Sequence, residues 1–120
     1  MLDFADALGR SWPILIEAAR MRRTVSYSEL AGRAGRPLTA RAIHRQLLKG
    51  LSTRCRKSGL PDLAALVVRK GSGIPGGGWF GVNGLDAREP LTRWSEAVLA
   101  CYSHQWSSRP DRRLLARADD

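Results

Sequence analysis

The chain has 120 residues, 43% of them hydrophobic and 26% charged, which suits one hydrophobic core and excludes both a two-domain protein and a disordered basic tail. Its 20 Lys and Arg against 11 Asp and Glu give a formal charge of +9, and a field of this sign attracts polyanions, with nucleic acid the default partner. Only three of the cations are lysines, and guanidinium groups suit bidentate contacts to phosphate or guanine, although a GC-rich genome also supplies arginine codons.

Three helices are expected before residue 36. The first covers residues 3–8, and a second begins at Ser11 and reaches about Arg20, because Ser caps free backbone N–H groups and the nearby Pro13 is tolerated in a first turn. Ser26 and Glu29 fit a capping box, which predicts a third helix from Tyr27 to about Ala34 after a short β-favouring stretch. Gly35 suits the left-handed residue that ends such a helix.

A basic amphipathic helix is expected next, from about Leu38 to Lys49. Thr39 can cap it, apolar side chains recur at helical spacing, and cationic ones point in other directions. Gly50 either ends this helix or lies inside one that continues for two more turns, at a cost of about 1 kcal/mol for the glycine. The sequence leaves both alternatives open.

The second half of the chain predicts a β-hairpin and a last helix. Leu63 to Val68 is a continuous apolar run typical of a buried strand, residues 71–78 form a glycine-rich loop, and Trp79 to Val82 form a second short strand. An amphipathic helix follows from about Glu89 to Tyr102. The expected fold is α+β and mainly α, a winged helix-turn-helix-like domain over residues 1–106 with a charged C-terminal tail over 107–120.

The cysteine and hydropathy patterns exclude several classes of protein. Cys55 and Cys101 have no CxxC spacing and only two histidines to join them, so neither a metal site nor a disulfide framework is expected, and no cofactor is. The N-terminus has no signal-peptide pattern, and no apolar run approaches the length of a membrane span. A reducing, cytoplasmic location without membrane contact is expected.

The order of helix, capped helix, basic helix and hairpin is that of a helix-turn-helix with a wing, in which one helix enters a groove and a loop touches the backbone. The segment from Val25 to Pro37, VSYSELAGRAGRP, followed by Ala40-Arg41-Ala42-Ile43, resembles the DNA-binding domain of alkylguanine-DNA alkyltransferases and alkyltransferase-like proteins. The resemblance covers roughly Trp12 to Phe80. It implies that Arg41 fills the space of a flipped-out nucleotide.

The same resemblance implies that the reactive motif is absent. When the two valines that follow the family's Pro-Cys-His-Arg are aligned with Val67 and Val68, residues 63–66 fall under the motif, with Ala64 at the cysteine and Ala65 at the histidine. Alkyl transfer requires a thiolate and a base that activates it. The resemblance therefore implies DNA binding without catalysis.

The sequence thus predicts a non-catalytic DNA-binding protein of bacterial or phage type. It is expected to bind duplex DNA through a basic recognition helix and a Gly-rich wing and to sense a modified or distorted base. It would act alone or with a protein partner or fused enzyme. Two alternatives are a nuclease or glycosylase, which would need clustered carboxylates or an activated nucleophile, and a protein-interaction module that docks an acidic partner. The candidate nucleic-acid-binding residues are Tyr27, Thr39, Arg41, His44, Arg45, Lys49, Arg54, Arg56, Lys57, Arg69, Lys70 and Trp79.

Overall fold

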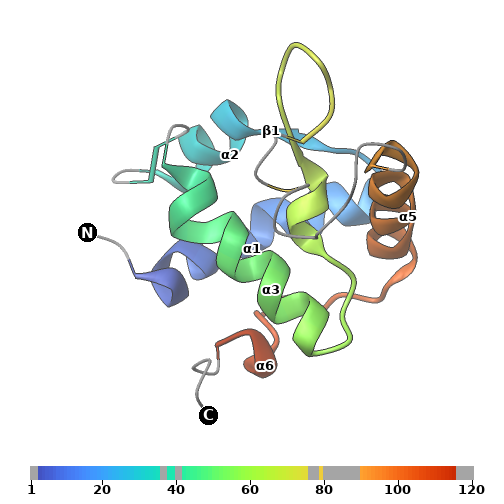
Figure 1. Ribbon diagram of the computed structural model, residues 1–120. Coiled ribbons are helices and arrows are strands. Elements are labelled where there is room, and N and C mark those ends of the chain that lie inside the picture. The colour runs from blue at the N-terminus through green and yellow to red at the C-terminus, as the bar shows by residue number, and fades with distance from the viewer. Residues whose placement is uncertain (1–2, 36–37, 40–41, 76–78, 80–89, 116–120) are drawn as a thin grey trace.

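A long helix, α1, spans Phe4–Arg20 and carries much of the core (Figure 1). The computed structural model describes residues 3–35, 38–39, 42–75, 79 and 90–115. Asp3 caps α1 by accepting a hydrogen bond from the backbone N–H of Asp6, and the helix runs on without a break. The two separate helices expected here are therefore one.

Ser11 lies inside α1, so its predicted role as a helix cap is wrong. Its hydroxyl is buried and has no hydrogen-bond partner, while Pro13 occupies an exposed position in the same helix. Proline removes one backbone donor inside a helix. The buried faces of Leu8, Trp12 and Leu15 keep the helix continuous, because their packing outweighs that local cost.

Strand β1 (Val25–Ser26) leads directly into helix α2 (Tyr27–Ala34), as expected. The Ser26 side chain accepts a hydrogen bond from the Glu29 backbone N–H at 3.0 Å, which confirms the cap. Gly35 follows with φ 86° and ψ 164°, and its N–H donates to the Ala31 carbonyl. This combination of dihedral angles is open almost only to glycine.

The basic helix begins later and ends later than expected. Leu38 and Thr39 are not helical, so the expected start at Leu38 is wrong. A π-helical turn, η1 (His44–Leu48), continues into α3 (Lys49–Lys57), so Gly50 lies inside the run. A Cβ at position 50 would lie 3.2 Å from the Phe4 ring, and the glycine therefore lets α1 approach α3 closely. Buried side chains recur every four residues at Ile43, directly before η1, and at Leu47, Leu51 and Cys55 within the run, with Leu48 and Ser52 buried beside them.

The strand expected over residues 63–68 is confirmed only at its end. Leu63–Leu66 form a short 3₁₀ helix, η2, which Asp62 caps by accepting from the Ala64 N–H, and only β2 (Val67–Val68) is extended. β2 pairs in parallel with β1, with Val25 opposite Val67 and Ser26 opposite Val68. The second strand was expected over residues 79–82; Trp79 is instead helical, and residues 80–82 lie outside the described part.

Helix α5 (Pro90–Ser103) closes the fold near the predicted place, and a short helix, α6 (Arg112–Leu115), follows. Leu91 stands at helical spacing with Trp94, Val98 and Cys101, yet its side chain is 54% exposed. Trp94 anchors the helix instead, because its Nε1 donates to the Ala65 carbonyl at 2.8 Å. In the ranges that the structure describes, no helix combines the length and apolarity that crossing a membrane requires.

Candidate nucleic-acid interface

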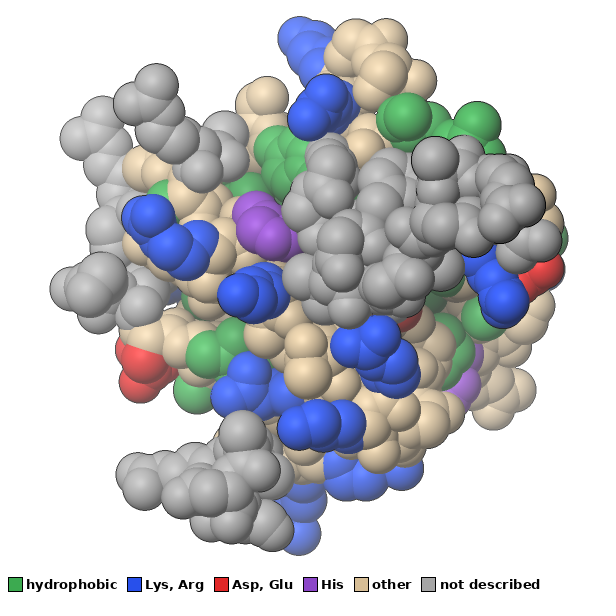
Figure 2. Space-filling view, in the orientation of Figure 1, with side chains coloured by type: hydrophobic (Ala, Val, Ile, Leu, Met, Phe, Trp, Pro, Cys, Tyr) green, Lys and Arg blue, Asp and Glu red, His purple; other side chains and the backbone are tan. Residues whose placement is uncertain are grey.

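One stretch of the chain holds most of the excess positive charge. Residues 30–61 contain no Asp or Glu and eight Lys or Arg, a charge of +8 out of +9 for the chain, and η1 and α3 lie within this stretch. Figure 2 shows Lys and Arg side chains spread over the face on which α3 lies, with few acidic side chains in view. We call this surface the basic face and define it by Arg45, Lys49, Arg56 and Lys57.

The four side chains of the basic face are exposed. Arg45 and Lys49 are one helical turn apart, and Arg56 follows Lys49 by two turns, so these three point to the same side of the run. Within the described residues, Arg45, Lys49 and Lys57 form no ion pair. Their charge therefore remains available to a polyanion.

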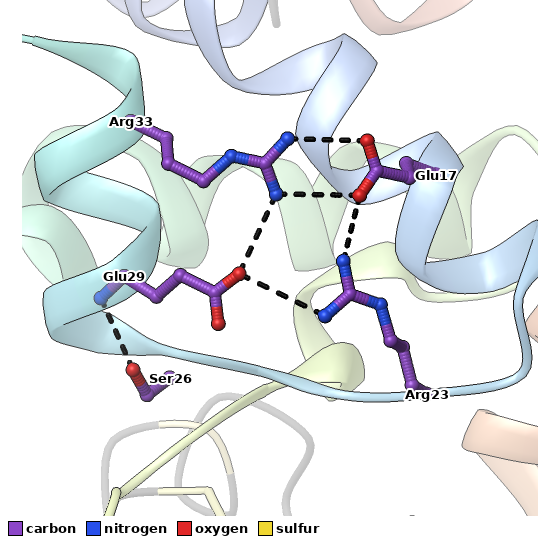
Figure 3. A network of polar contacts seen from close by, with 5 residues as sticks. All are labelled: Glu17, Arg23, Ser26, Glu29 and Arg33. Carbon is purple, nitrogen blue, oxygen red and sulfur yellow. Dashed lines mark hydrogen bonds and ion pairs between the residues drawn. The ribbon is translucent and has the colours of Figure 1, made fainter.

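Other arginines are neutralised within the fold (Figure 3). Glu17 of α1 pairs with Arg23 at 2.6 Å and with Arg33 of α2 at 3.1 Å, and Glu29 lies 3.4 Å from Arg33 and 3.9 Å from Arg23. The hydrogen bonds from Arg33 and then Arg23 hold the pKa of Glu17 below its usual value. This network, which we call the α1–α2 network, fixes α2 against α1 and balances the charges of two arginines that lie outside the basic face.

His44 and Arg54 differ in role from the four residues of the basic face. Burial, followed by the charge of Lys49, lowers the pKa of the half-buried His44, so its imidazole is neutral near pH 7. The guanidinium carbon of Arg54 lies 3.9 Å from the centroid of the Phe4 ring, a cation–π contact between α3 and α1. Arg54 thus has a packing role that the sequence did not indicate.

The loop after β2 carries two more exposed cations, Arg69 and Lys70. The Arg69 N–H donates to the Ile74 carbonyl at 2.8 Å, and the Gly73 N–H donates to the Arg69 carbonyl at 2.9 Å, so the loop closes on itself. In Figure 1 this yellow loop projects from the body of the molecule. Neither cation forms an ion pair among the described residues.

The remaining candidate residues are distributed over different environments. Tyr27 is half-buried and packs on the core, and Thr39 is exposed and accepts from the Ala42 N–H at 3.3 Å. Trp79, one of the candidate binding residues, is only 4% exposed and donates from Nε1 to Asp62 at 3.0 Å, so its ring packs in the core. Arg41 lies outside the described residues.

Sequence reasoning missed the contribution of α6. Arg113 donates from Nη1 to the Ser58 carbonyl at 3.1 Å, directly after the end of α3, and Leu114 is fully buried. Asp111 accepts from the backbone N–H of Arg113, and the Pro110-Asp111 pair before four helical residues is the signal that could have indicated a helix start.

The environment of residues 63–66, where the reactive motif would lie, is apolar. Ala64 and Ala65 are buried in η2. Both cysteines are buried free thiols, and burial raises the pKa of Cys55 to about 12 and that of Cys101 further, so neither is a thiolate near pH 7. Among the described residues, no group of three or more His, Cys, Asp or Glu side chains could hold a metal ion.

Comparisons of the chain with protein-family models, with curated protein sequences and with solved structures gave no match.

Proposed function

We propose that this chain is a non-catalytic protein that binds duplex DNA through the helical run His44–Lys57. The observation that carries the proposal is the acid-free stretch of residues 30–61, in which Arg45, Lys49 and Lys57 of η1 and α3 are exposed and form no ion pair among the described residues. Phosphate contacts of Lys and Arg supply most of the sequence-independent affinity for DNA.

The dimensions of the run suit the major groove of a duplex. Fourteen residues at about 1.5 Å per residue give a length of roughly 20 Å, and the groove is about 12 Å wide and admits one helix. Arg45, at the N-terminal end of the run, is in the position from which recognition helices contact base edges.

Duplex DNA is favoured over a single strand because single-strand binding relies on exposed aromatic rings on which bases stack. Among the described residues, every Phe, Tyr and Trp is buried or half-buried. The Phe4 ring is also covered by the Arg54 guanidinium.

A winged helix-turn-helix arrangement is part of the proposal. In this proposal α2, which the α1–α2 network holds against α1, serves as the supporting helix, and the projecting loop with Arg69 and Lys70 serves as the wing. This assignment is supported by the pairing of β2 with β1, because the loop follows β2 and β1 leads into α2.

The resemblance to alkyltransferase-like proteins extends the proposal to the sensing of a modified or distorted base, with Arg41 in the space of a flipped-out nucleotide. Alanines at the two positions of the reactive pair and the protonated state of both cysteines support binding without alkyl transfer. A protein partner or fused enzyme would then act on the marked site.

The test is a mobility-shift titration of plain, mismatched and base-modified duplexes over a series of salt concentrations. Arg45→Gln and Lys49→Gln are expected to weaken binding. The negative slope of log K against log salt is expected to become smaller in magnitude, by about 0.9 for each phosphate that the variant no longer neutralises. Arg41→Ala is expected to remove any preference for the modified duplex while retaining most of the general affinity.

Arg93→Gln is the matched control, since Arg93 is 58% exposed but lies on α5, away from the run. Failure of the wild-type chain to bind any duplex below micromolar concentration at modest salt would overturn the proposal. So would equal effects of the three glutamine variants. Binding only to an acidic protein would favour the interaction-module alternative.

A further inference from the structure

The end of α3 is joined to α6 by specific contacts. Arg113 donates to the Ser58 carbonyl at 3.1 Å from Nη1 and to the Asp111 carboxylate from Nε and Nη2, at 3.0 Å each. Leu114 of α6 is fully buried. These contacts hold residues 111–115 against the body of the molecule, although the sequence predicted a separate charged tail from residue 107.

This junction brings together three exposed cations from two parts of the chain. Lys57 ends α3, and Arg112 and Arg113 begin α6. We call these three residues the α3–α6 corner. Among the described residues, Asp111 pairs with Arg113, whose hydrogen bonds lower the pKa of Asp111, so the three cations and this carboxylate leave a net charge of +2 near pH 7. Figure 2 shows Lys and Arg side chains continuing along the face of α3 toward this end.

The sign of this charge is opposite to that of a helix end by itself. The C-terminus of a helix carries a partial negative charge, which repels phosphate. At the end of α3, the Arg113 guanidinium donates a hydrogen bond to the Ser58 carbonyl, and Arg56 and Lys57 lie in the last turn. The corner therefore presents a cationic surface where a bare helix terminus would be unfavourable to a nucleic-acid backbone.

Geometry indicates what lies opposite this surface. A run of roughly 20 Å is longer than the width of about 12 Å of the major groove. If the run crosses the groove at an angle, with Arg45 at the base edges, the C-terminal end of α3 extends past the groove edge, over the sugar–phosphate backbone.

We propose that the α3–α6 corner is a second DNA-contact site, which binds consecutive phosphodiester groups at the edge of the groove occupied by the basic run. The inference rests on the proposed function and adds residues 112–113 to the binding surface. Because phosphate contacts carry no sequence information directly, the corner sets affinity and orientation, and the N-terminal end of the run sets base preference.

The experiment is a salt series of duplex binding by the full chain and by the double variant Lys57→Gln/Arg112→Gln. Neither side chain forms a hydrogen bond or ion pair among the described residues, so the variant is expected to keep the wild-type thermal unfolding midpoint. We expect weaker binding to every duplex tested, by the same factor, and a salt slope smaller in magnitude by about 1.8, which is 0.9 for each of two phosphates. Arg45→Gln is expected to change the ranking of duplexes as well.

Arg93→Gln is again the control, because its exposed fraction of 58% equals that of Arg113 and it lies on α5. If the wild type binds and the double variant has the same affinity and salt slope as this control, the corner is not a contact site and the proposed function stands. If the variant binds more weakly with an unchanged salt slope, or has reduced affinity for only some sequences, phosphate contact at the corner is also overturned. If the wild type binds no duplex, both proposals fail.

Discussion

Gly35 ends α2 in a backbone conformation that other residues rarely adopt, with φ 86° and ψ 164°. Gly35→Ala is therefore expected to lower the free energy of unfolding by about 1–3 kcal/mol. Equilibrium urea denaturation at neutral pH measures the change.

Gly32 supplies the matched control for this substitution, because it lies inside α2 with no atom within 4 Å of a built Cβ. Gly32→Ala should raise the free energy of unfolding by about 0.5–1 kcal/mol through helix propensity. Equal effects of the two alanines would contradict the conformational role of Gly35.

Single residues were predictable where one local interaction decides the structure. Ser26 caps α2 and Gly35 ends it, because each needs only its near neighbours in the chain. Trp79 was not predictable: its burial depends on Asp62, 17 positions earlier, which accepts its indole hydrogen bond. The local sequence around a tryptophan does not distinguish a buried ring from a stacking platform.

At the scale of elements, the α1–α2 network makes the packing of two helices sensitive to pH. The pKa of Glu17 is lowered from 4.5 by hydrogen bonds from Arg33 and Arg23, so its contribution to stability is present above that pH and is lost as the pH falls through the lower value in the folded state. We expect the wild type to lose more stability than Glu17→Gln between about pH 5 and pH 3. Urea midpoints of both proteins at each pH measure this difference.

Glu96→Gln is the control for the network, since Glu96 is 63% exposed and, among the described residues, pairs only with Arg93, at 3.9 Å. It should leave the pH dependence of the wild type nearly unchanged. High salt should reduce the difference in stability between the wild type and Glu17→Gln, because the ion pairs of the network are partly exposed and salt screens them.

Elements were predictable where a cap marks the start, as for α2, or where hydrophobic periodicity extends over several turns, as for α5. The apolar run 63–68 was predicted as a strand because all six residues are apolar and the run has no period, and the Asp62 cap that turns its first part into η2 is a single hydrogen bond. The parallel pairing of β1 with β2 could not be predicted, since each strand has only two residues.

For the whole molecule, the sequence alone shows where the positive charge is concentrated. The charge of the acid-free stretch is visible in the sequence, and the structure brings its residues Arg45, Lys49 and Arg56 to one side of a helical run. The addition of α6 to the same face was not predictable, because it depends on a hydrogen bond between Arg113 and Ser58, 55 positions apart.

The packing of α6 makes a prediction about the extent of the folded body. Leu114 is fully buried, so Leu114→Ala is expected to lower the free energy of unfolding by about 2–5 kcal/mol, as for other large-to-small substitutions in a core. Thermal and urea denaturation, followed by circular dichroism, measure the decrease.

The neighbouring Leu115 is 44% exposed, and Leu115→Ala should change stability by no more than about 0.5 kcal/mol. If Leu114→Ala also left stability unchanged, residues 111–115 would not belong to the cooperative unit, and the α3–α6 corner would lose its structural basis.

The pairing of Val25 with Val67 has a consequence for the order in which the chain assembles. The partners are 67 − 25 = 42 positions apart, and closing a loop of that length costs about 3 kcal/mol in chain entropy. A ladder of two residues on each strand cannot offset this cost alone, so the strands meet only after the intervening helices have packed. Exchange of the protected ladder amides with deuterium then requires the whole molecule to open, and their exchange rate reports its global stability.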